Sequence, residues 1–125
     1  MQGVDQARIM QRVNIDHVRL AGNVLGLGLQ LVCKRGFFGG LKPTAGQIEY
    51  CYGFCRAMSL TIGHDLEDEV AFCICVFWHV FGKKGGKHIM WLMRTEPTFA
   101  GPMQDGWEAF VAWRDDKRSP IPPSP

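Results

Sequence analysis

The chain has 125 residues and a hydrophobic content of 46%, which is enough to build the core of one domain. Charged residues make up 21%, close to the globular average, so the composition excludes disorder along the whole chain. The formal charge is only +2, which gives no general field to attract nucleic acid or an anionic membrane.

The cysteines and the apolar segments predict the compartment. An odd count of five, spread through apolar segments, favours free buried thiols over a disulfide framework. Residues 1–8 show no basic stretch leading into an apolar run, so we expect no signal peptide and a cytoplasmic location. The best membrane candidate, Val18 to Cys33, would be a helix of about 24 Å, shorter than the roughly 30 Å hydrocarbon core. We therefore expect a soluble protein.

A first long helix is predicted over Ile15 to Lys34, with Asn14 as N-cap. Its polar residues fall in one narrow stripe of a helical wheel, whereas a strand would scatter them over both faces. These residues are Asp16, Arg19, Asn23, Gln30 and Lys34. Gly22 and Gly26, one turn apart, would let a neighbouring helix approach closely, and we favour packing within the chain over a dimer contact.

A second helix should begin after Thr44 and end at Gly63. The Thr44 hydroxyl and the Gln47 side chain have the spacing of a capping box, and the apolar residues that follow keep helical spacing.

The segment that follows is the centre of the predicted fold. Asp65 is a suitable N-cap, the acidic residues behind it favour the positive end of a helix dipole, and 70–81 is apolar all round. The same segment is rich in strand formers, so the alternative is a β-hairpin over 70–94 with Gly82–Lys87 as its loop. The caps favour the helix.

A last helix is predicted from Asp105, as N-cap, to about Lys117. The proline-rich tail 119–125 cannot continue a helix and should be extended and disordered. The prediction is therefore an all-α domain over 1–118, with four or five helices around a central apolar helix, and the alternative is an α+β domain with the hairpin at 70–94.

No motif in the sequence specifies a reaction. Asp68, Cys75 and His79 share one face of the predicted central helix, and a Cys–His pair one turn apart can form a thiolate nucleophile. No oxyanion donor accompanies them, so an enzyme using these residues is the less favoured alternative. Cys55 would lie roughly 10 Å along the helix axes from His79, too far for Cys51, Cys55, Cys75 and His79 to share one zinc ion, so we predict no metal and no cofactor.

Two groups of residues are candidates for binding a partner. The first is the Gly/Lys segment 82–88, read as a solvated loop; it fails the P-loop pattern, and with Arg94 it is the most basic region. The second is the aromatic face of the last helix, since such side chains often dominate interfaces. The candidate residues are Lys83, Lys84, Lys87, Arg94, Trp107, Phe110 and Trp113.

These observations favour a small cytoplasmic protein-interaction module, such as an adaptor, inhibitor or immunity-type partner, that acts by surface complementarity without catalysis. Its partner would be another protein or a second copy of the chain. The alternatives are an enzyme with the Cys/His pair, and a weak nucleic-acid or phosphate binder through the 82–88 loop. The near-neutral charge disfavours nucleic acid.

Overall fold

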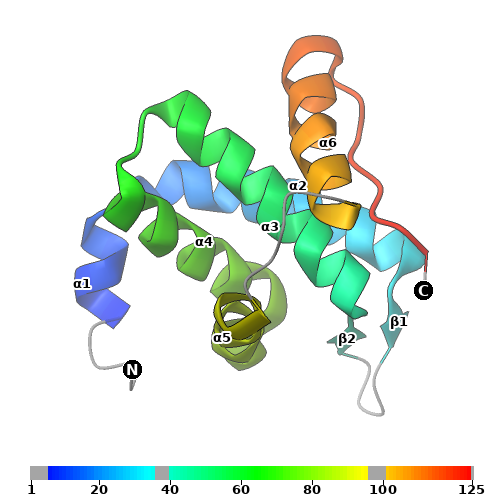
Figure 1. The fold of residues 1–125 in the computed structure, drawn as a ribbon, viewed down its shortest axis with the longest axis horizontal. Coiled ribbons are helices and arrows are strands. Elements are labelled where there is room, and N and C mark those ends of the chain that lie inside the picture. The colour runs from blue at the N-terminus through cyan, green and yellow to red at the C-terminus, as the bar shows by residue number, and fades with distance from the viewer. Residues whose placement is uncertain (1–5, 36–39, 96–100, 125) are drawn as a thin grey trace.

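A computed structural model describes residues 6–35, 40–95 and 101–124, and confirms the predicted compact all-α class (Figure 1). The helices are α1 (Gln6–Gln11), α2 (Ile15–Val32), α3 (Ala45–Ile62), α4 (Leu66–Phe81), the 3₁₀ helix η1 (Gly82–Lys84), α5 (Gly85–Thr95) and α6 (Pro102–Asp116). Two short antiparallel strands, β1 (Lys34–Arg35) and β2 (Leu41–Lys42), pair Lys34 with Lys42 and Arg35 with Leu41.

The predicted caps set the starts of the three long helices. The Asn14 and Asp65 side chains accept hydrogen bonds from the backbone N–H groups of Asp16 and Asp68, at 2.8 Å each. Thr44 and Gln47 form the predicted capping box. At the other end of α3, Gly63 adopts a left-handed conformation with φ of 96°, which glycine reaches without strain.

The apolar segment 70–81 is the central helix, as predicted. α4 contacts α1, α2, α3 and α5, and its residues Phe72, Val76 and Phe77 are fully buried. α3 lies between α4 and α6 and contributes Phe54, Cys51 and Cys55 to the same core. Gly22 of α2 packs against the His79 ring of α4, so this glycine serves close packing within the chain.

The structure corrects the solvated loop predicted over 82–88, and it excludes the alternative hairpin. No β-hairpin forms over 70–94: α4 ends at Gly82, and the chain continues directly as η1 and α5. The Gly/Lys segment is therefore helical, and only its first glycine acts as a turn, with φ of 63°. Gly85 makes the tight reversal possible, because a Cβ there would collide with the backbone of Phe77.

The C-terminal region differs from the prediction in two respects. α6 begins at Pro102 rather than after Asp105; proline is favoured at the first helical position, and Asp105 lies in the first turn. The tail, predicted to be disordered, is extended through Ser124 but packs against the domain (Figure 1). Pro122 is fully buried, and the Pro123 carbonyl oxygen accepts a hydrogen bond from Gln47 Nε2 at 2.9 Å.

Within the described ranges, no helix combines the length and the apolar character that crossing a membrane requires.

Candidate interaction groove

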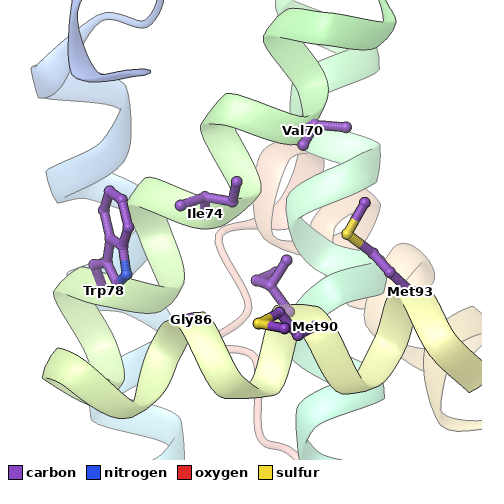
Figure 2. Close-up of a pocket in the computed structure, with 7 residues that line it drawn as sticks. Val70, Ile74, Trp78, Gly86, Met90 and Met93 are labelled. Atoms are coloured by element: carbon purple, nitrogen blue, oxygen red, sulfur yellow. The ribbon is translucent and has the colours of Figure 1, made fainter. Parts of the chain in front are cut away.

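An apolar groove separates α4 from α5 (Figure 2). The two helices diverge from the turn at η1, with Trp78 near the closed end and Val70 and Met93 at the open end. The groove has a volume of about 290 Å³. Its lining residues are Val70, Ile74 and Trp78 from α4, and Gly86, Ile89, Met90 and Met93 from α5.

The spacing of these residues follows from helix geometry. Val70, Ile74 and Trp78 recur every four positions, so they form one stripe along α4. Met90 and Met93 extend from the facing side of α5 and are 47% and 61% exposed. Exposed methionines next to a hollow form a deformable apolar surface, because the side chain is long, unbranched and polarizable.

The apolar surface continues past the groove toward α1. A neighbouring hollow shares Val70 and Ile74 with the groove and adds Ile9 and Leu66. Leu66 stands at the start of α4 and is 74% exposed. The two hollows together expose an apolar strip along α4, of the kind that marks interaction sites.

The α5 side of the groove is basic. Lys83, Lys84, Lys87 and Arg94 are all exposed, and η1 and α5 contain no acidic residue. None of these four cations forms an ion pair with a carboxylate in the described part of the chain. Their charge is therefore available to a partner.

The acidic start of α4 is partly compensated within the chain. Arg12, just after α1, pairs with Glu67 and Asp68 at 3.0 Å each, and Arg56 of α3 pairs with Glu69 at 3.4 Å. Two arginines thus face three paired carboxylates, and Asp65 adds a fourth, so the α4 end stays acidic whereas the α5 side is basic.

His88 lies in α5 and is half-buried. Its ring meets the Phe81 ring edge-on with centroids 4.9 Å apart, and Nε2 is buried without a hydrogen-bond partner in the described structure. Burial, with the nearby charge of Lys84 as a smaller cause, lowers the pKa of His88 below its usual value. This histidine is therefore neutral at physiological pH and adds nothing to the basic wall.

Of the three predicted catalytic residues, Cys75 and His79 line one hollow, but His79 and Asp68 interact with other residues. His79 Nε2 lies 2.9 Å from Asn23 Oδ1, and the Asp68 carboxylate accepts from Arg12. Cys75 is only 5% exposed, and burial, together with the neighbouring Cys73 thiol, raises its pKa to about 11. A thiol with that pKa is almost wholly protonated at neutral pH, which is the opposite of an activated nucleophile.

The aromatic candidates of α6 belong mainly to the α3–α6 contact. Phe110 is buried, with its ring edge-on to Phe54 at 5.4 Å, and Trp113 is tilted against Phe54 at 6.0 Å. Trp107 is half-buried beside Arg56. Phe110 is therefore a core residue, and the four predicted cations lie in η1 and α5, on the side of the groove that α5 forms.

In the described ranges, no three His, Cys, Asp or Glu side chains are arranged to hold a metal ion. The five cysteines are free and buried.

The sequence interpretation missed the groove residues Val70, Ile74, Trp78, Met90 and Met93. The signal was present as the four-residue spacing of Leu66, Val70, Ile74 and Trp78. Because 70–81 is apolar all round, however, the pattern alone does not show which side another helix leaves open.

Comparison of the chain with protein-family models, with curated proteins and with solved structures finds no match in any of the three.

Proposed function

We propose that this protein is an interaction module, without catalytic activity, that holds an amphipathic helix of a partner protein in the groove between α4 and α5. The observation that carries the proposal is an apolar groove with exposed Met90 and Met93 beside an uncompensated row of cations. Helix-in-groove recognition uses such a surface: apolar anchors at helical spacing enter the groove, and flanking charges fix the orientation.

The charges specify the partner. Lys83, Lys84, Lys87 and Arg94 lie in η1 and α5, which contain no acidic residue, so the complementary helix carries Asp or Glu on the flank that faces α5. The five buried free thiols support a reducing compartment, and we place the interaction in the cytoplasm.

The shape of the site favours an acidic helix over two other partners that carry negative charge, an anionic membrane and a nucleic acid. Val70, Ile74 and Trp78 are half-buried in a recess between two helices, which fits the side chains of a helix better than a flat bilayer surface (Figure 2). A nucleic-acid backbone would use the lysines but leave the methionine-lined groove empty.

The test is a calorimetric titration with a designed helical peptide of about 18 residues, with leucine on one face and glutamate on the flank that would face α5. We expect binding to the wild-type protein and at least about tenfold weaker binding to the Met90→Gln/Met93→Gln variant and to Lys84→Glu/Lys87→Glu. Leu60→Gln is the matched control, since Leu60 is 64% exposed on α3, outside the groove.

A second peptide, with lysine in place of every glutamate, tests the charge argument. Equal affinity for both peptides would contradict the acidic partner, and unchanged binding by the methionine variant would contradict the groove. If an oligonucleotide binds instead, with affinity that falls steeply with salt and is lost in Lys84→Glu/Lys87→Glu, the nucleic-acid alternative replaces this proposal.

A further inference from the structure

A second apolar surface lies on α2, away from the groove. Leu20, Leu27 and Leu31 are 45%, 67% and 74% exposed, and Val24, in line with them, is half-exposed. The spacing of these four residues is four, three and four, which is the seam of a two-helix coiled coil. The opposite side of α2 is buried in the domain through Val18, Ala21, Leu25 and Leu29.

We infer that this stripe joins two copies of the chain, with α2 antiparallel to α2 of the second copy. The stripe is complementary to itself in that orientation. With a two-fold axis passing between residues 25 and 26, Leu20 faces Leu31 of the second copy, and Val24 faces Leu27 of the second copy. Two-fold dimers are the commonest closed assemblies, and they require such a self-complementary patch.

The charges and amides beside the stripe agree with the antiparallel orientation. Asp16 is exposed at the start of α2 and Lys34 just beyond its end, so opposite charges meet when the helices run antiparallel and like charges meet when they run parallel. Asn23 and Gln30 lie on the same flank and approach each other across the dimer. Asn23 Oδ1 is engaged by His79, but its amide N–H₂ group remains to donate.

The dimer leaves the proposed groove accessible. In Figure 1, α2 lies behind α3 and α5 lies in front of α4, so the two surfaces are on opposite sides of the molecule. Two grooves on one dimer would raise the avidity for a partner with two helices.

Sedimentation equilibrium over a concentration series tests the dimer. We expect the wild-type protein to pass from monomer to dimer, and Leu27→Glu/Leu31→Glu to raise the dissociation constant about tenfold or more. Leu60→Glu, which places a glutamate at an exposed leucine of α3, should leave the dissociation constant unchanged. A wild-type chain that stays monomeric at every concentration, or equal effects of the two variants, overturns the inference.

Disulfide trapping tests the orientation, because the native cysteines are all buried. A mixture of Leu20→Cys and Leu31→Cys proteins should form the mixed cross-linked dimer on mild oxidation. Neither variant alone should cross-link, since the two like positions lie about 16 Å apart along an antiparallel pair. Cross-linking of Leu31→Cys with itself would show a parallel pair and overturn the register.

Discussion

Two glycines set the distance between α3 and α6. Gly53 of α3 lies against the Met103 carbonyl of α6, and Gly106 of α6 lies against the Tyr50 carbonyl of α3. The pair is reciprocal, so each helix presents bare backbone to the other. The close approach brings Phe54 and Phe110 into edge-on contact in the core.

We predict that Gly53→Ala lowers the free energy of unfolding by about 1–3 kcal/mol, because its Cβ would collide with backbone rather than with a flexible side chain. Gly46→Ala, in the same helix, is the control. Its Cβ would meet Pro102 at 3.5 Å, an ordinary contact, and alanine should add up to about 1 kcal/mol of helix propensity. Urea unfolding of both variants makes the comparison, and equal effects would contradict the close-packing argument.

At the scale of elements, the start of α3 holds the C-terminal tail. Gln47 closes the capping box through Oε1 and donates from Nε2 to the Pro123 carbonyl. Pro120 and Pro122 pack beside Gly28 of α2, which has no Cβ to exclude them. One buried side chain thus joins a helix cap to a segment 76 positions further along the chain.

Deleting residues 119–125 should therefore lower the free energy of unfolding by about 1–3 kcal/mol, since it uncovers apolar surface and removes the acceptor of a buried amide. Deleting only residues 124–125 keeps Pro122 and the Pro123 carbonyl, and it should change little. Urea unfolding of the two truncations, followed by far-UV circular dichroism, distinguishes them. If both truncated proteins were as stable as the wild type, the tail would contribute nothing to stability and the prediction would be wrong.

The elements predicted from sequence are those whose signals are local. Asn14, Thr44 and Asp65 cap helices through bonds to residues two or three positions away, so the sequence contains the whole signal. The packed tail depends on Gln47, and the turn into α5 depends on Gly85 meeting Phe77, which are contacts that only the folded chain brings together.

The same distinction applies to the groove. The cations Lys83, Lys84, Lys87 and Arg94 were candidates because charge is visible in sequence. Whether Val70 and Ile74 are covered or open depends on the angle at which α5 leaves α4, and no local pattern encodes that angle.

Across the whole molecule, the buried thiols link proton binding to folding. Cys51 and Cys55 lie in α3, Cys73 and Cys75 in α4, and Cys33 caps α2, so the thiols extend through the centre of the core. Burial raises the pKa values of Cys33, Cys51, Cys55 and Cys75 above the ordinary 9.0. Folding therefore favours the neutral thiols.

The difference in thiol pKa between the folded and the unfolded chain predicts a loss of stability at alkaline pH. Between pH 9.0 and about 11 the unfolded chain releases the Cys75 proton while the folded chain retains it, so the native state binds more protons. The free energy of unfolding then falls as pH rises, by up to about 1.4 kcal/mol per pH unit for each such thiol. Well below pH 9.0 both states are protonated and the thiols cause no pH dependence.

The Cys75→Ala variant isolates the contribution of one thiol to the loss of stability at alkaline pH. Its slope of stability against pH should be shallower than the wild-type slope, by up to about 1.4 kcal/mol per pH unit, between pH 9.0 and about 11. The packing lost in Cys75→Ala lowers the free energy of unfolding by the same amount at every pH, so this loss does not affect the slope. Urea unfolding under reducing conditions at several pH values measures both quantities. Parallel slopes would mean that Cys75 ionises alike in the folded and unfolded chains, and its burial would then have no electrostatic consequence.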